Sequence, residues 1–310
     1  MKRSVIHFQF PVLLLLLAGC TQGEPLPGED TAAKSLLQVS HLQTATEYPA
    51  TTRAASTTNY TGNIGLFMKA DATNGYAAKN NVKGIYEPGT TPRWAFVSAI
   101  WLNNHNATIA VYAPHDAGQS TAAALKLKAA LRTDDKKDIW YARVTDANFK
   151  KASLSLTLTH VYARCIITVK RAASYLPDAK ITALSLAGTG IYSDATFKLL
   201  EASPYDYSGA ATGFTPTGVT AQTLNAATSS VAYDLLLIPS TLSGNITLTL
   251  TVDNQTMKQT IAAGKFSGKL EAGKQYAITA TLRPGELDAS VTVEPWSTTP
   301  LMAERQNTNK

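Results

Sequence analysis

The side chains best suited to nucleophilic or metal chemistry in this sequence are two cysteines and five histidines. Transition metals need such ligands at short spacings, as in HxH or HExxH, and a catalytic nucleophile needs a base nearby. The histidines stand apart from one another and from the cysteines; they are His7, His41, His105, His115 and His160. Motifs such as GxSxG, the P-loop and GxGxxG are also missing. The sequence therefore predicts no enzyme activity, no metal and no cofactor.

Cys20 is the one residue whose surroundings predict a covalent modification. Two basic residues near the N-terminus precede an apolar run over residues 12–17, and Leu17-Ala18-Gly19 leads directly into Cys20. This arrangement resembles the lipobox of bacterial lipoproteins, whose cysteine thiol accepts diacylglycerol and whose acyl chains, such as palmitate, insert into a membrane. We expect residues 1–19 to be a signal peptide and Cys20 to tether the chain to the outer membrane. The alternative is an ordinary signal peptide followed by a cysteine by chance.

Cys165 is the second cysteine, and it lies in the apolar run Arg164-Cys165-Ile166-Ile167. Such a run is typical of a buried strand, where cysteine behaves as a small hydrophobic residue. We expect Cys165 to be buried rather than to act as a nucleophile. If Cys20 is lipidated, Cys165 has no partner for an intrachain disulfide.

The composition is typical of an exported β-protein, with 45% hydrophobic but only 16% charged residues. The net charge is +6, but no basic run is interleaved with aromatic residues, so nucleic-acid binding is not expected. Residues 21–30 are rich in Gly, Pro and acids, which predicts a flexible tether. Glu24, Glu29 and Asp30 resemble the surface-export signal of lipoproteins of the Bacteroidetes. An acidic linker without an address remains the alternative.

Alternation of apolar and polar residues recurs through the chain and predicts half-buried strands. It is clearest in residues 153–159 and in residues 245–252, where Asp253-Asn254 predicts the turn of a hairpin. Residues 233–239 are mostly apolar and predict a central strand. Residues 122–131 are the one stretch that could be helical. Regular short strands of this kind predict an all-β fold built of β-sandwiches.

Four tryptophans could provide a carbohydrate-stacking surface; they are Trp94, Trp101, Trp140 and Trp296. Each of them, however, lies in or next to a predicted strand. Packing in the core is the interpretation that we favour. A surface glycan-binding lipoprotein is kept as an alternative function.

An ordered set of local patterns resembles the fimbrillin-like proteins of Bacteroides and relatives, the subunits of type V pili. Besides the pattern at Cys20, the set spans nearly the whole chain; it comprises Asn63-Ile64-Gly65-Leu66-Phe67-Met68, Trp94, Ile109–Tyr112 followed by Pro114, Leu154–Lys170, Leu235-Leu236-Leu237-Ile238-Pro239, Ala272-Gly273-Lys274-Gln275-Tyr276 and Val293-Glu294-Pro295-Trp296.

The resemblance implies two transthyretin-like Greek-key β-sandwich domains in tandem, for which we expect residues 54–172 and 173–310. It also implies a tether and propeptide over residues 20–53, whose first strand is removed after cleavage by an arginine-specific protease. A neighbouring fimbrial subunit then fills the groove by strand exchange. The product would be a cell-surface fimbria that serves adhesion and biofilm formation.

The sequence supplies candidates for each part of this assembly. The removable strand would contain Leu36, Leu37 and Val39, and the bond between Arg53 and Ala54 would be the cleavage site. The segment after Trp296 contains only Leu301 and Met302 as apolar anchors, which is a poor donor strand. A possible donor strand therefore includes Val291, Val293, Trp296 and Leu301. Stalk, tip and non-polymerising anchor subunits all remain open at this stage.

Overall fold

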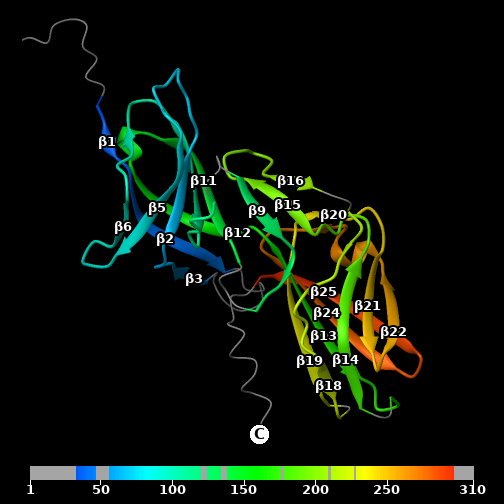
Figure 1. Cartoon of the computed structure of the whole chain (residues 1–310). Coiled ribbons are helices and arrows are strands. Elements are labelled where there is room, and N and C mark those ends of the chain that lie inside the picture. The colour runs from blue at the N-terminus through cyan, green and yellow to red at the C-terminus, as the bar shows by residue number, and fades with distance from the viewer. Residues whose placement is uncertain are drawn as a thin grey trace, which may run out of the picture. The chain divides into compact units, whose positions relative to one another are not determined.

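The computed structural model describes residues 33–46, 56–119, 124–133, 138–175, 178–208, 211–226 and 228–296. These residues form an all-β fold, which confirms the predicted fold class (Figure 1). Within them, helical structure is limited to two 3₁₀ turns, η2 (Phe149–Lys151) and η3 (Ala263–Phe266). None of the described helices has the length and apolar character needed to cross a bilayer.

Strands from the first half of the chain form an eight-stranded sheet in the order β12-β11-β8-β4-β5-β6-β2-β3. Neighbouring strands in this order are antiparallel. In addition, β2 pairs in parallel with β12, so the strand of this sheet that comes first in the chain contacts the one that comes last. A separate pair joins β1 (Ser35–Leu36) to β7 (Trp101–Leu102). The bounds of the sheet's strands are β2 (Gln38–Thr46), β3 (Ser56–Asn59), β4 (Ile64–Met68), β5 (Lys79–Glu87), β6 (Arg93–Phe96), β8 (Ala107–Ala113), β11 (Trp140–Ala147) and β12 (Ser153–His160).

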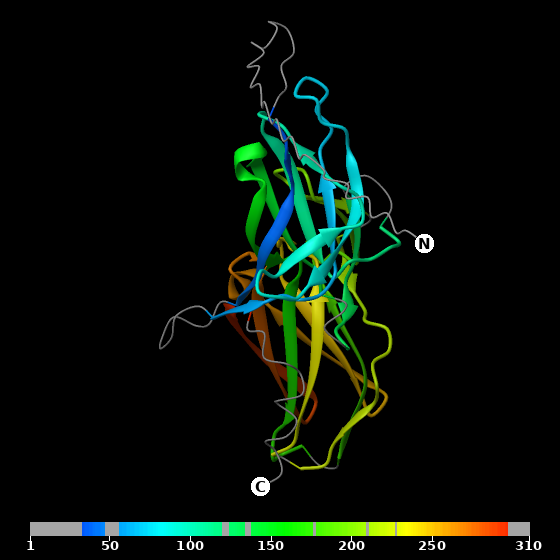
Figure 2. The same ribbon diagram turned by 90° about the vertical axis from the view of Figure 1, so that its left-hand side faces the viewer.

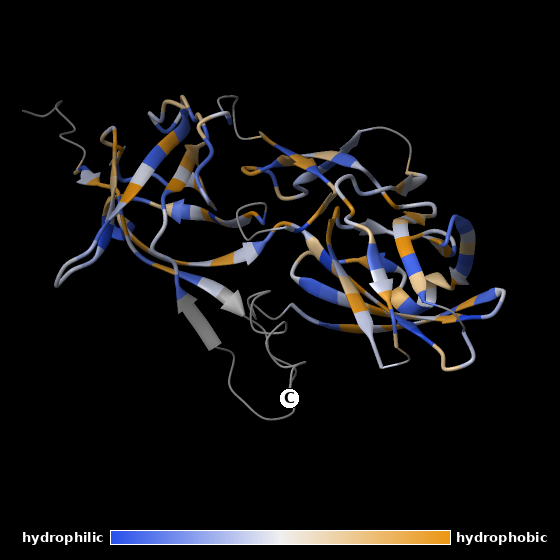
Figure 3. Ribbon diagram, turned by 60° about the horizontal axis from the view of Figure 1, so that its bottom comes forward, coloured by the Kyte–Doolittle hydropathy of each residue, from blue (hydrophilic) through white to orange (hydrophobic). Residues whose placement is uncertain are grey.

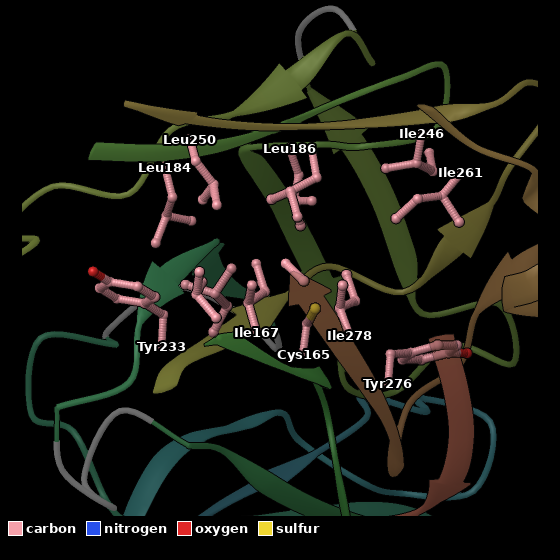
Figure 4. Close-up of a cluster of buried hydrophobic side chains, with 14 of the residues drawn as sticks. Cys165, Ile167, Leu184, Leu186, Tyr233, Ile246, Leu250, Ile261, Tyr276 and Ile278 are labelled. Atoms are coloured by element: carbon pink, nitrogen blue, oxygen red, sulfur yellow. The ribbon is translucent and has the colours of Figure 1, made fainter. Parts of the chain in front are cut away.

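Two sheets of the second half pack face to face, as in a β-sandwich. One sheet has the order β10-β19-β13-β24-β25, and the other has the order β17-β14-β21-β22 with β18 paired to β14. Figure 4 shows side chains of the second sheet, including Leu184 and Leu250, pointing toward Cys165, Ile167 and Ile278 of the first. The strands are β10 (Ala130–Leu131), β13 (Ala163–Arg171), β14 (Ala179–Ala187), β17 (Gly213–Phe214), β18 (Gln222–Leu224), β19 (Ser230–Leu237), β21 (Ile246–Val252), β22 (Gln255–Ile261), β24 (Lys274–Arg283) and β25 (Glu286–Pro295).

A smaller sheet joins the two halves of the chain. It contains β9 (Ala124–Lys128), β15 (Asp194–Lys198) and β16 (Tyr205–Ser208), in the order β16-β15-β9. A further pair links β20 (Ser240–Thr241) to β23 (Lys269–Leu270). Beneath these strands, residues from both halves share one buried cluster that includes Phe67, Tyr112, Phe197 and Trp296.

Periodicity explains why most of these strands form where they do. In β12, serines and threonines are exposed while Leu154, Leu156 and Leu158 are buried, and β21 alternates in the same way. Figure 3 shows hydrophilic and hydrophobic residues alternating along the strands. Asp253 and Asn254 both have positive φ angles, 50° and 62°, which a two-residue loop of the favoured hairpin type requires. The predicted hairpin between β21 and β22 is therefore confirmed.

The helical interpretation of residues 122–131 is wrong, because the described part of this stretch forms β9 and β10. Leu125 and Leu127 are buried and alternate with exposed Lys126 and Lys128, which is the period of a strand. Pairing with β15 then satisfies the backbone of β9. The alternation was present in the sequence and outweighs the helix propensity of Ala, Leu and Lys.

The pairing of β13 bears on where the two predicted domains meet. A boundary between residues 172 and 173 assigns β13 to the first half, yet this strand pairs along its length with β19 and β24. We therefore propose that the boundary lies between β12 and β13, at residues 161–162.

Candidate functional site

The first long strand, β2, occupies an unusual place in its sheet. It pairs in parallel with β12 from Gln38 opposite Ser153 to Thr44 opposite Leu158. On its other side it pairs with β3 and, through Val39 alone, with Trp94 of β6. Strand β2, drawn in dark blue, therefore lies between β12 on one side and β3 and β6 on the other (Figure 1).

The side chains of this first segment form part of the hydrophobic core. Leu37 is 2% exposed, and Val39 and Leu42 are fully buried, packed in one cluster with residues of β12 and β6. Burying each such side chain stabilises the fold by roughly 1.5–3 kcal/mol. Backbone hydrogen bonds add to this, since Leu37 N donates to Ile100 O and Gln38 N to Ala152 O, both at 2.8 Å. Without this strand, the sheet would have an apolar groove and an unpaired edge on β12.

The predicted removable strand thus lies where its loss would open a groove. Leu37 and Val39 point into the core, whereas Leu36 is 40% exposed and pairs with Trp101. The chain leaves β2 at Thr46 and returns at Ser56 of β3. Arg53 and Ala54, the predicted cleavage site, and Cys20, the predicted lipidation site, lie outside the described residues.

The predicted donor residues are placed within this chain's own fold. Val291 and Val293 belong to β25, which pairs antiparallel with β24 along its whole length. Trp296 is 1% exposed and its backbone N–H donates to Gly273 O at 3.0 Å. Leu301 lies outside the described residues. We therefore propose that any donor segment begins after Trp296 rather than at Val291.

The fimbrillin-like sequence profile matches residues 52–296. The chain belongs to the fimbrillin-like family. The matched segment begins beside the predicted cleavage site and ends at Trp296, the last described residue. No curated protein matches this chain.

Solved structures with the same fold come from species of Bacteroides and Parabacteroides. A candidate cell adhesion protein from Bacteroides uniformis has a TM-score of 0.57 at 16% identity, covering 88% of this chain and 100% of that one. One from Bacteroides ovatus also has a TM-score of 0.57, at 17% identity over 84% of this chain and 98% of that one. A third, from Parabacteroides distasonis, has a TM-score of 0.50 at 12% identity over 84% and 98%. At such identities the likeness establishes the fold.

A buried charged network in this fimbrillin-like protein was not predicted from the sequence. Asp234 of β19 accepts hydrogen bonds from Arg164 Nε at 3.0 Å and Nη2 at 2.8 Å, and from Arg132 Nη1 at 3.0 Å. Arg164 Nη1 also donates to Gln275 Oε1 at 2.8 Å. All four side chains are less than 9% exposed. The sequence did contain a signal for this network, because Asp234 is the one acid in the otherwise apolar run of residues 233–239. A charge that is buried in a strand needs a partner of opposite charge.

Trp296 lies against this network and against the end of β12. Its ring stacks on the His160 ring with centroids 3.8 Å apart and an interplanar angle of 7°, and both Arg132 and Arg164 place Cζ 5.9 Å from its centroid. His160 Nδ1 lies 2.7 Å from Asp138 Oδ2. His160 is thus a packing residue at the junction of the two halves.

The tryptophans do not form a stacking row for a glycan. Trp94 and Trp296 are 3% and 1% exposed, whereas Trp101 is 56% exposed on a different strand. Trp140 is half-buried and packs against Tyr60 and His160. Core packing therefore accounts for most of them.

His115, another of the isolated histidines, lies beside an acid whose contacts close a turn. His115 and Asp116 border a shallow pocket with Tyr112, and the Asp116 carboxylate accepts the Gly118 N–H at 2.8 Å, which closes a turn. Burial, and then the charge of Lys83, lower the pKa of His115. Among the described residues, no three His, Cys, Asp or Glu side chains gather in a way that could hold a metal ion.

Cys165 is fully buried in the second-half core, as expected from its apolar run. Burial, and then the nearby Asp234 carboxylate, raise the pKa of its thiol. We predict that Cys165 does not react with a disulfide reagent such as DTNB at mildly alkaline pH in the folded protein. It should react at once in denaturant, and rapid reaction of the folded chain would contradict this packing.

Proposed function

We propose that this chain is a structural subunit of a cell-surface fimbria that is exported as a lipoprotein through Cys20, cut after Arg53 and polymerised by strand exchange. Membership of the fimbrillin-like family supports the fimbrial role. Adhesion and biofilm formation are the activities that such a fimbria would serve. Its partners would be other fimbrial subunits, an arginine-specific protease and, before processing, the outer membrane.

The observation that carries the proposal is the position of β2. Its side chains belong to the core, but its chain connection to the body runs through residues 47–55, which contain Arg53. A cut after Arg53 would leave residues 20–53 held only by hydrogen bonds and packing. Once this segment departs, the groove beside β12 is open to an extended segment of another subunit.

The test compares protein sheared from the surface of cells that express the wild-type chain or Arg53→Gln. Intact mass and N-terminal sequencing should find Ala54 at the N-terminus of wild-type chains in ladders that resist boiling in detergent. Arg53→Gln should remain monomeric with Cys20 at its N-terminus. Lys34→Gln is the matched control, since Lys34 is an exposed basic residue of the same propeptide.

The outcomes separate the fimbrial roles. Polymers of Arg53→Gln equal to those of the wild type would exclude cleavage at this bond. A wild-type chain that stays monomeric with a lipidated Cys20 would instead identify a non-polymerising anchor.

Leu42→Ala should distinguish the unprocessed from the processed chain. Because Leu42 is fully buried, its truncation should destabilise the unprocessed protein by about 2–5 kcal/mol. In the processed protein residue 42 has left with the propeptide, so the stability should equal that of the wild type. Urea denaturation of both forms measures this difference.

Leu156→Ala provides the control for that comparison. Leu156 lies on β12, which pairs with β2 but stays in the chain after processing. It should weaken both forms, whereas equal destabilisation of both forms by Leu42→Ala would show that β2 is not removed.

A further inference from the structure

Exposed large hydrophobic side chains gather on one part of this protein. Among the described residues five are exposed, and four of them lie on β1, β5, β7 or directly after β6; these four are Leu36, Ile85, Val97 and Trp101. Their exposed fractions are 40%, 44%, 66% and 56%. We call this set the apolar face. Grouping of this kind is unusual on a soluble surface and indicates an interaction site.

Strand alternation explains why these side chains point outward. In the β5–β6 hairpin, Val82 and Trp94 point into the core, so their neighbours along each strand point away from it. Ile85 lies opposite Ala95, and the Val97 N–H donates to Lys83 O at 3.0 Å. Leu36 and Trp101 form a register pair beside this hairpin.

One shallow pocket lies between β1, which carries Leu36, and β6, which Val97 directly follows. Leu36 of β1 lines it together with Ala95 and Phe96 of β6 and with Ala99. In Figure 2 the blue first strands and the cyan strands of the hairpin run across the side that faces the viewer. The pair Leu36 and Trp101 thus lies next to the hairpin that carries Ile85 and precedes Val97.

Basic residues accompany the apolar face. Lys34 is exposed immediately before β1, and Lys83 is half-buried in the same outward row as Ile85. Arg93 is also exposed and forms an ion pair with Glu87 at 3.0 Å. Apolar and aromatic side chains next to lysine are the combination that favours the headgroup region of an anionic bilayer.

We propose that, in the lipid-anchored precursor, the apolar face docks on the surface of the membrane that holds Cys20. This inference rests on the proposed lipoprotein anchor and concerns the chain before cleavage, while Leu36 is still attached. Residues 21–35 reach at most roughly 50 Å when fully extended, so the tether keeps β1 near the bilayer. Contact through Trp101 and Val97 would hold the body of the precursor against the lipid surface.

The size of the apolar face favours a membrane over a second copy of the chain. Four partly exposed side chains supply a few hundred Å² of apolar surface, about half of the ~800 Å² per partner that a stable protein interface buries. A lipid surface needs no matching partner surface, and each buried apolar group contributes separately to binding.

Vesicle flotation of the mature chain carrying Cys20→Ser tests the proposal without an attached lipid. The probe is vesicles of phosphatidylcholine with phosphatidylglycerol. The chain should float with these vesicles, and Trp101→Ser with Val97→Ser should lower its partition coefficient about tenfold. Tyr207→Ser is the matched control, because Tyr207 is the fifth exposed large hydrophobic residue and lies on β16, and it should bind like the parent chain.

A second measurement uses a conservative substitution that keeps an aromatic ring at position 101. Brominated phospholipids should quench tryptophan fluorescence of the parent chain, and Trp101→Phe should remove most of that quenching. Absence of vesicle binding by the parent chain, or equal binding by the double variant, would overturn the proposal. The proposal would also be overturned if analytical ultracentrifugation found a dimer of the parent chain that the double variant does not form. In that case the apolar face would bind a second copy of the chain. None of these three results bears on cleavage at Arg53.

Discussion

Replacing Asp234 by alanine should lower the free energy of unfolding by about 3–5 kcal/mol. The carboxylate is 6% exposed and accepts hydrogen bonds from two guanidinium groups, those of Arg132 and Arg164. Its removal leaves both cations in a buried setting without their shared anion. Because desolvation of a charge is costly, the loss should be larger than for deletion of an ordinary surface carboxylate. Urea denaturation followed by circular dichroism measures the effect.

Asp288→Ala is the control for this prediction. The Asp288 carboxylate accepts a hydrogen bond from Arg283 at 3.0 Å, but its side chain is 56% exposed. Water screens such a pair, so its loss should cost no more than about 1 kcal/mol. Equal effects of Asp234→Ala and Asp288→Ala would mean that the buried network contributes little to stability.

Local periodicity was sufficient to predict most of the strands. The leucines of β12 and the alternating residues of β21 are predicted by their spacing alone, because side chains in a strand alternate between two faces. The turn at Asp253-Asn254 was predictable because these residue types tolerate positive φ angles. These features depend only on neighbouring residues.

Pairing between distant strands could not be derived in the same way. The parallel pairing of β2 with β12 joins residues more than a hundred positions apart, as the hydrogen bond from Ser40 Oγ to Leu154 O shows. Periodicity predicts that both strands are half-buried, but many partners satisfy that requirement. The pairing of β13 with β19 could not be derived for the same reason.

Residues of the candidate site were predicted unevenly. Burial of Val39 and Leu37 follows from apolar residues early in the mature chain, and the resemblance to fimbrillin-like proteins gave them a role. The partners of Trp296 were not predictable, because Arg132, His160 and Arg164 approach it from separate strands and loops. A long-range cluster of this kind has no signature in local sequence.

Replacing Trp296 by alanine should lower the free energy of unfolding by about 3–5 kcal/mol. The indole is 1% exposed, stacks on His160 and lies beside two arginines, so its loss leaves a cavity at the junction of the two halves. Trp101→Ala changes the same residue type at a position that is 56% exposed and should have little effect on stability. Similar destabilisation by both variants would contradict the packing described for Trp296.

The same variant should also affect assembly, because of where Trp296 lies. Its partner His160 ends β12, and Leu158 of β12 pairs with Thr44 near the end of β2. In the proposed strand exchange, the groove left by β2 would end near Thr44, shortly before the segment that contains Arg53. Trp296, after which the C-terminal segment continues, lies close to this end of the proposed groove. We expect Trp296→Ala to be cut at Arg53 at the wild-type rate but to form fewer detergent-resistant polymers. Trp296→Phe, which keeps an aromatic ring to stack on His160, should recover most of the polymer. Full polymer yield from Trp296→Ala would show that subunit assembly does not depend on this anchor.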